Sequence, residues 1–248
     1  MLFSSNNNKP NYNIIWNKIN ITPSVYLKSG IHREQFPLTE QYTSTRSSLY
    51  YVNNFIELKG KWDNSPNFGS LLSLKLKNIS KNSIRISKLY FPAENGLDNF
   101  LQNFDSKNIS FLRNGYQSWS TSRSYRISDK PLRPWMEIVS RTSSNLSNLP
   151  SNIPGDISSE MYSVITDLKT NESFLVGQCP PFNQFFYIRL RISKKQTKLN
   201  YFELIFDFGD KMLNPGQSIA IDGILMAIGD TLQIQEKYLA YIQNQMKI

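Results

Sequence analysis

One block of this sequence combines flat aromatic rings with paired hydrogen-bonding groups. It is NGYQSWS, residues 114–120. Tyr116 and Trp119 each offer an apolar face with a polar edge, while Gln117 and Ser118 offer donors and acceptors. This chemistry suits a sugar, whose C–H face stacks on a ring and whose hydroxyl groups need paired partners. The same residues also suit an aromatic plug at the rim of a β-sandwich, so two roles are open.

The chain has one cysteine and one histidine, which limits the other kinds of site. Cys179 lies among apolar neighbours in GQCPPFNQ, and we expect a buried, inert thiol because no base accompanies it. His32 lies in SGIHREQF without a nucleophile motif, so we expect it on the surface. With so few ligands we expect no metal and no other cofactor.

The basic residues are numerous but dispersed. Lys and Arg outnumber Asp and Glu by 28 to 19, for a formal net charge of +9, yet Lys194-Lys195 is the only adjacent basic pair. We therefore predict no nucleic-acid partner. No apolar run reaches the length of a signal peptide or a membrane span. The expected location is cytoplasmic, without membrane attachment.

Most of the chain shows the alternation typical of β-strands, and its 15 Phe and 13 Tyr favour the same structure. Residues 70–92 contain two apolar alternations separated by the polar segment NISKNS, which predicts a hairpin. Residues 218–228, SIAIDGILMAI, are nearly all apolar and predict a central strand that is covered on both faces. Residues 94–104 have apolar residues at helical spacing and predict a short helix or turn.

The last residues of the chain change period. Residues 231–248 predict a helix with Asp230 as its N-cap, Gln233 three residues later, and an apolar stripe of Leu232, Tyr238, Leu239 and Ile242. The rest of the chain contains about fifteen strand signals, and open sheets rarely exceed ~10 strands without splitting. We therefore predict an all-β fold: a large two-sheet β-supersandwich with one C-terminal helix.

The block at 114–120 resembles the NGYQSWS or NGWQSWS block of glycoside hydrolase family 36, the α-galactosidases or melibiases. In that family the block lies in an N-terminal β-supersandwich domain. Residues 158–192 are similar to the strand pair that follows it there, and residues 213–242 are similar to the segment that leads to the catalytic barrel. The resemblance covers about residues 45–245, and the heptapeptide is its most specific part.

The resemblance implies a division of the chain and of the chemistry. Residues 1–230 correspond to the N-terminal β-supersandwich domain and residues 231–248 to a linking helix. The family's (β/α)8 barrel, which holds the nucleophilic and the acid/base aspartates of retaining α-galactoside hydrolysis, is absent from this sequence. The chain is therefore expected to be inactive alone and to meet a galactoside only together with such a barrel.

The resemblance also assigns roles to side chains. It makes Trp119 the first and Tyr116 the second candidate for an aromatic wall of the sugar pocket, with Gln117 and Ser118 holding the loop. Trp135 and Arg133 in LRPWM are further candidates, and packing at an interface is the alternative for both.

Several alternatives remain open from the sequence. Asp207 and Asp210 come closest to a replacement carboxylate pair, but we expect them to be solvated acids at the end of a strand; Asp156 and Glu160 border the loop. A stand-alone carbohydrate-binding, lectin-like module is the main alternative function, and a degenerate remnant is another. The sequence leaves open the oligomeric state, and hydrolysis versus galactosyl transfer.

Overall fold

The computed structural model describes residues 23–29, 32–40, 48–65, 69–94, 104, 108–115, 122–126, 129, 156–192 and 199–247. These residues form fifteen β-strands and the helix α3 (Thr231–Met246). The strands are β1 (Ser24–Ser29), β2 (His32–Pro37), β3 (Thr39–Glu40), β4 (Ser48–Val52), β5 (Ile56–Ser65), β6 (Gly69–Asn78), β7 (Ile84–Glu94), β8 (Ile109–Arg113), β9 (Arg123–Arg126), β10 (Asp156–Glu160), β11 (Tyr162–Asp167), β12 (Glu172–Gln178), β13 (Phe185–Ile192), β14 (Leu199–Leu213) and β15 (Ser218–Asp230).

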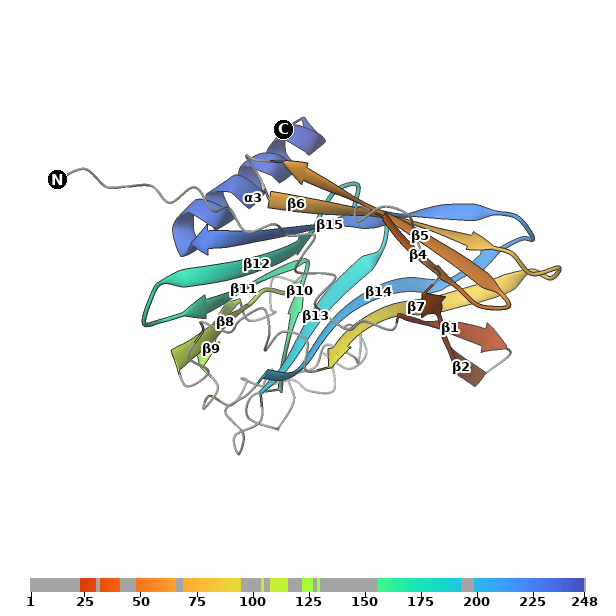
Figure 1. Cartoon of the computed structure of the whole chain (residues 1–248), viewed down its shortest axis with the longest axis horizontal. Coiled ribbons are helices and arrows are strands. Elements are labelled where there is room, and N and C mark those ends of the chain that lie inside the picture. The colour runs from red at the N-terminus through yellow and green to blue at the C-terminus, as the bar shows by residue number, and fades with distance from the viewer. Residues whose placement is uncertain are drawn as a thin grey trace.

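The strands form two antiparallel sheets, which confirms the predicted all-β sandwich. One sheet has six strands in the order β10-β13-β14-β7-β1-β2, and the other has nine in the order β3-β4-β5-β6-β15-β12-β11-β8-β9. In Figure 1 the sheets lie as two layers, and α3 lies on the side of the nine-stranded sheet that is away from β7 and β14. The edges β9 and β10 belong to different sheets.

The main core fills the space between the sheets. Side chains alternate across each strand, so one face of β6 contributes Leu72, Leu74 and Leu76, which are almost fully buried. The six-stranded sheet contributes aromatic rings, including Phe186 and Phe206 with centroids 4.8 Å apart. Burial of one such large apolar side chain contributes about 1.5–3 kcal/mol, and this cluster contains more buried side chains than the second cluster under α3.

The hairpin predicted for residues 70–92 is wrong. β6 pairs with β5 and β15, whereas β7 pairs with β1 and β14 in the other sheet. The chain crosses between sheets next to Asn78, which is fully buried and donates through Nδ2 to the carbonyl groups of Asn82, at 2.9 Å, and Leu213, at 3.0 Å. Because the Asn78 side chain hydrogen-bonds to Leu213 of β14, the polar segment NISKNS carries the chain from one sheet to the other instead of closing a hairpin.

β15 is the predicted central strand, and both of its faces are covered. It is the fifth of the nine strands. Ile221 and Ile224 both face the main core, although two residues separate them, because a β-bulge interrupts the pairing with β6 between them. On the opposite face Leu225 and Ala227 pack in a second cluster with α3.

Helix α3 begins at the predicted cap. The Asp230 carboxylate accepts from the backbone N–H groups of Leu232, at 3.1 Å, and Gln233, at 3.2 Å. The predicted apolar stripe is only partly correct: Leu232 and Leu239 are 71% and 56% exposed, and the fully buried side chains are Ile234 and Tyr238. The helix is thus rotated from the face that the sequence pattern favoured.

Tyr238 sets how closely α3 approaches the sheet. Its ring lies over Gly177 of β12, where a Cβ atom would come within 2.5 Å of the ring, and its hydroxyl donates to the carbonyl oxygen of Gln178 at 2.7 Å. A glycine is therefore required at this position to admit the ring. The helix is fixed to β12 by both packing and a hydrogen bond.

A buried carboxylate lies at the bulge in β15. Asp222 is 2% exposed, and its Oδ2 accepts from Gln178 Nε2 at 2.8 Å and from the Gln184 backbone N–H at 2.9 Å. Gln184 Oε1 in turn accepts from the Asp222 backbone N–H at 2.8 Å. Asp222 Oδ1 has no partner among the described residues. Burial raises the pKa of Asp222, although these hydrogen bonds oppose the shift.

We predict that Asp222→Asn changes the pH dependence of stability. The Asp222 carboxyl keeps its proton to a higher pH in the folded protein than in the unfolded chain. The stability that this protonated carboxyl provides is therefore fully present below about pH 4, and it is lost as pH rises through the raised pKa of the folded state. The variant should gain stability relative to wild type over that interval, by about 1.4 kcal/mol per unit of pKa elevation. Urea denaturation from pH 4 to 7 measures this difference.

The exposed Asp63→Asn change controls for the loss of one negative charge. A difference between the Asp222→Asn variant and wild type that stays constant from pH 4 to 7 would contradict the assignment.

Candidate functional site

The loop that carries NGYQSWS connects the last two strands at one edge of the nine-stranded sheet. β8 and β9 pair antiparallel, with Arg113 opposite Arg123 as the final pair. Residues 114–122 therefore connect these two paired strands in the sequence. Of the block itself the structure describes Asn114 and Gly115, which form the base of the loop.

The base of the loop is bonded to the edge of the other sheet. The Asn114 carbonyl oxygen accepts from the Glu160 backbone N–H at 2.8 Å, and Asn114 Nδ2 donates to the Glu160 carbonyl oxygen at 3.1 Å. The Asn114 backbone N–H donates to Ser159 Oγ at 2.8 Å. Three hydrogen bonds thus join the end of β8 to β10, so the loop starts where the two sheets meet.

The loop is also closed across its own base. Ser122 Oγ donates to Asn114 Oδ1 at 3.2 Å and accepts from the Gly115 backbone N–H at 3.3 Å. The Asn114 side chain therefore bonds on one side to β10 and on the other to the returning arm of the loop. The two ends of the loop are held together before its central residues begin.

A sharp turn of the chain stabilises this junction from the other side. Met161 has a φ of 63° and connects β10 of the six-stranded sheet to β11 of the nine-stranded sheet. Its backbone N–H donates to the Phe186 carbonyl at 3.1 Å, and its carbonyl accepts from the Gln178 N–H at 2.7 Å. Ser159 Oγ donates to the Tyr162 carbonyl at 2.6 Å. Strands that change sheets form the corner that holds the loop.

The predicted sugar-binding residues lie beyond this anchor. Trp119, Tyr116, Gln117 and Ser118 are outside the described residues, as are the further candidates Trp135 and Arg133. Their assigned roles therefore stay predictions. The structure establishes where their loop begins and ends.

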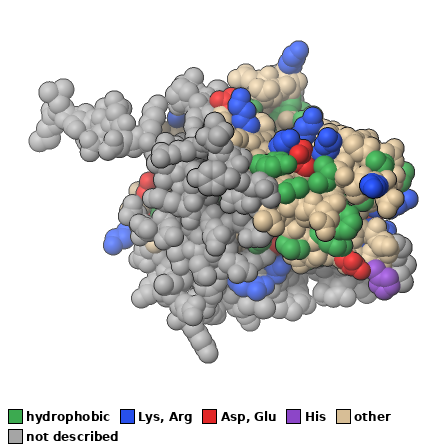
Figure 2. Space-filling view, turned by 45° about the vertical axis from the view of Figure 1, so that its right-hand side comes forward, with side chains coloured by type: hydrophobic (Ala, Val, Ile, Leu, Met, Phe, Trp, Pro, Cys, Tyr) green, Lys and Arg blue, Asp and Glu red, His purple; other side chains and the backbone are tan. Residues whose placement is uncertain are grey.

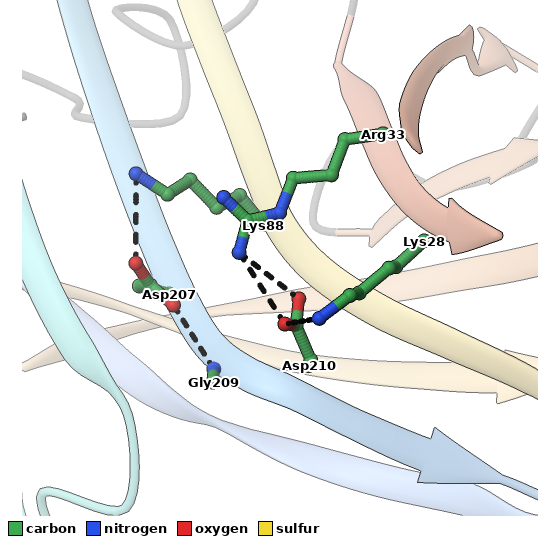
Figure 3. A network of polar contacts seen from close by, with 6 residues as sticks. All are labelled: Lys28, Arg33, Lys88, Asp207, Gly209 and Asp210. Atoms are coloured by element: carbon green, nitrogen blue, oxygen red, sulfur yellow. Dashed lines mark hydrogen bonds and ion pairs between the residues drawn. The ribbon is translucent and has the colours of Figure 1, made fainter. Parts of the chain in front are cut away.

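The carboxylates that came closest to a catalytic pair are engaged in ion pairs. Asp210 lies 2.7 Å from Lys28 Nζ and 3.3 Å from Arg33, and Asp207 lies 3.5 Å from Lys88 Nζ (Figure 3). Hydrogen bonding from Lys28, with further help from Arg33, lowers the pKa of Asp210. A general acid needs the protonated form, which this environment disfavours.

The expectation that these acids end a strand is wrong. β14 continues to Leu213, and the pairing with β7 is interrupted between Asp207 and Lys211 by a bulge. Gly209 and Asp210 adopt φ values of 61° and 60° there, and the Gly209 N–H donates to Asp207 Oδ1 at 2.9 Å. The two acids stabilise the bulge and its contacts with β1, β2 and β7.

The other residues singled out have plain surroundings. Cys179 is 2% exposed, and burial raises the pKa of its thiol to about 12, which fits the predicted inert thiol. His32 is exposed on the edge strand β2, as predicted. Glu160 is half-buried beside the loop base, and the Asp156 side chain is outside the described part.

The described residues offer neither a metal site nor a membrane-spanning helix. They contain no group of three or more His, Cys, Asp or Glu side chains arranged to hold a metal ion. No helix among them is long and apolar enough to cross a membrane.

The fold brings together lysines that are separate in the sequence. On β5 and β6 Lys59 lies directly opposite Lys75, with Lys61 and Lys77 on the same outward face. Glu57 offsets part of this charge through an ion pair with Lys59 at 3.0 Å. Figure 2 shows basic side chains lying beside hydrophobic and acidic ones on the face that it presents. The absence of a nucleic-acid partner stays a prediction.

Sequence reasoning missed the residues that hold the loop. Ser159 and Ser122 are ordinary serines among many, and no local motif marks them. Arg113 and Tyr125, on the inner face of the β8–β9 hairpin, also carried no sequence signal. The pairing of β8 with β9 places Arg113 and Tyr125 on one face. The hydrogen bonds of Asn114 bring Ser159 and Ser122 to the base of the loop.

No model of a known protein family matches the chain, and no curated protein matches it in sequence. Solved structures do resemble it. The family 36 α-galactosidase AgaB from Geobacillus stearothermophilus has a TM-score of 0.47 and 10% identity, over 89% of this chain and 32% of that one. The galactosidase domain of the α-galactosidase-sucrose kinase AgaSK has a TM-score of 0.48 and 10% identity, over 87% and 31%.

A polysaccharide lyase, BACCELL_00875, also resembles this chain, with a TM-score of 0.42 and 10% identity over 89% of this chain and 28% of that one. The chain thus spans about 30% of the length of the structures that it resembles. The family 36 resemblance that the sequence motif indicated also appears among solved structures.

We predict that Ser159→Ala weakens the loop anchor. The substitution leaves the Asn114 N–H and the Tyr162 carbonyl without their partner at a position that is fully buried. An unsatisfied buried group costs about 1–3 kcal/mol, and urea denaturation measures the loss. Ser124→Ala, at an exposed position of β9, is the matched control and should stay within about 0.5 kcal/mol of wild type. Equal stability of the two variants would contradict the anchor.

Proposed function

We propose that this chain is the non-catalytic N-terminal domain of an α-galactosidase-like glycoside hydrolase. In this proposal residues 1–230 form the supporting β-supersandwich and residues 231–248 the helix that links it onward. The complete enzyme hydrolyses terminal α-galactosides with retention. The two reacting carboxylates belong to a (β/α)8 barrel that these residues do not contain.

The anchored loop base is the observation that carries this proposal. The NGYQSWS block begins at Asn114, which is bonded to β10 and to Ser122. A loop that is held at both ends and at the junction of two sheets can present its rings in a fixed direction. Trp119 then forms the aromatic wall of the pocket with Tyr116 beside it, while Gln117 and Ser118 hold the loop.

The described ionisable groups support the proposal that another domain carries out catalysis while this one positions the substrate. Retaining hydrolysis uses two carboxyl groups about 5–5.5 Å apart, one of which must be protonated. Among the described acids, Asp207 and Asp210 form ion pairs and Asp222 is buried under the sheet. The contribution of this chain is therefore to orient the sugar ring and to shield one side of the pocket from water, which accelerates a reaction through positioning.

We predict that the purified chain alone does not release p-nitrophenol from p-nitrophenyl α-galactoside. The reason is that Asp207 and Asp210, the nearest to a catalytic pair in the sequence, are held in ion pairs with Lys88 and with Lys28 and Arg33. A known α-galactosidase assayed in the same buffer serves as the positive control. Turnover by the wild-type chain that a Trp119→Ala variant abolishes would place a complete active site in this chain and would overturn the proposal.

A lectin-like module is the second candidate, because the loop base is held by contacts within this chain alone. Titration with melibiose, followed by tryptophan fluorescence, separates the two. A domain that supplies one wall should show no saturable change at about 1 mM sugar. A saturable change that Trp119→Ala removes would favour the lectin-like function.

A further inference from the structure

The inner face of the β8–β9 hairpin ends in two arginines. Arg113 and Arg123 lie directly opposite each other, one register position beyond the pair Phe111 and Tyr125 on the same face. Phe111 and Tyr125 belong to the core between the sheets. The two arginines are therefore the last residues of this face, at the end of the hairpin next to the loop base at Asn114.

These charges are poorly balanced. Arg113 is only 9% exposed, and no described carboxylate lies within ion-pair distance of it. The Arg123 guanidinium lies 4.5 Å from the Tyr125 ring centroid and only 4.0 Å from the Asp129 carboxylate. Like charges directly opposite each other on a sheet destabilise it, and a buried guanidinium remains charged. Among the described residues, Arg113 therefore lacks the negative partner that its buried charge needs.

The neighbouring phenol has the same need. Tyr125 is 1% exposed, and its hydroxyl has no hydrogen-bond partner among the described residues. A buried hydroxyl without a partner carries a cost of about 1–3 kcal/mol. Tyr125 thus adds a further unsatisfied donor to the face that carries both arginines. An acceptor-rich, negatively charged group would satisfy all three.

We propose that this end of the hairpin binds an oxyanion of a ligand, that is, a carboxylate or phosphate group, with Arg113 as the principal contact and Arg123 and Tyr125 as supporting donors. Arginine forms paired, charge-assisted hydrogen bonds with such groups. The binding site, which we call the arginine rim, comprises these three residues. It rests on the hairpin register and burial and does not depend on the α-galactosidase proposal, because a neutral galactoside carries no such charge.

The experiment measures thermal stabilisation of the full chain by three probes at matched ionic strength: inorganic phosphate, sodium galacturonate and neutral galactose. Sodium chloride at the same ionic strength corrects for screening. We expect phosphate or galacturonate to raise the Tm of wild type in a concentration-dependent way, and galactose to leave it unchanged. Stabilisation by galacturonate alone identifies an acidic sugar, and stabilisation by phosphate identifies a phosphate group.

Arg113→Gln should weaken binding of the active probe at least tenfold. Arg126→Gln is the matched control, because it removes the same charge from the same hairpin at a position on the opposite face, and it should bind like wild type. Tyr125→Phe should lose affinity several-fold without loss of Tm in the free protein, since its hydroxyl has no partner in the described part of the chain. A purely structural tyrosine would not show this combination.

If Arg113→Gln does not fold, Arg123→Gln and Tyr125→Phe decide the question. The proposal is overturned if neither anion stabilises wild type beyond chloride. It is also overturned if Arg113→Gln binds the anion as tightly as Arg126→Gln does. If Arg113→Gln does not fold, the proposal is overturned when Arg123→Gln and Tyr125→Phe both bind as tightly as Arg126→Gln.

Discussion

The structure around the loop depends on one constraint: the edge strand β10 of the six-stranded sheet must be joined to the nine-stranded sheet. A sheet edge leaves backbone groups without partners. Here the Glu160 N–H at the end of β10 donates to the Asn114 carbonyl at the end of β8. This bond joins the six-stranded to the nine-stranded sheet. At the same junction Met161 connects β10 directly to β11 of the other sheet. The loop with the aromatic block and the arginine rim both lie at this junction.

The two faces of the nine-stranded sheet pack against different parts of the protein. Its inner face forms the main core, and its outer face receives α3 through Tyr238 over Gly177. The bulge at Asp222 lets β15 serve both faces, but it places a carboxylate in the interior, where burial raises its pKa. The bulge in β14 instead places its acid, Asp210, beside cations that lower its pKa. Each bulge thus holds an acid, and the pKa of one is raised while the pKa of the other is lowered.

Local sequence patterns predicted the elements well and their partners poorly. Alternation identified the leucines of β6, and capping chemistry identified Asp230, because both signals act between residues that are close in the chain. The hairpin at 70–92 was wrong because Asn78 bonds to Leu213, far away in sequence. The face of α3 was misjudged because the fit of Tyr238 against Gly177 decides it. The loop anchor Ser159 and the arginine rim depend on register between strands, which no local pattern encodes.

We propose that the anchored loop presents Trp119 to a sugar at an open face. Acrylamide quenching of tryptophan fluorescence, compared between wild type and Trp119→Phe, tests it most directly. We expect the emission lost in the variant to be the readily quenched component, because an accessible indole collides with the quencher. Protection of that component from acrylamide would show Trp119 enclosed in the interior and would contradict a role for Trp119 in binding a sugar.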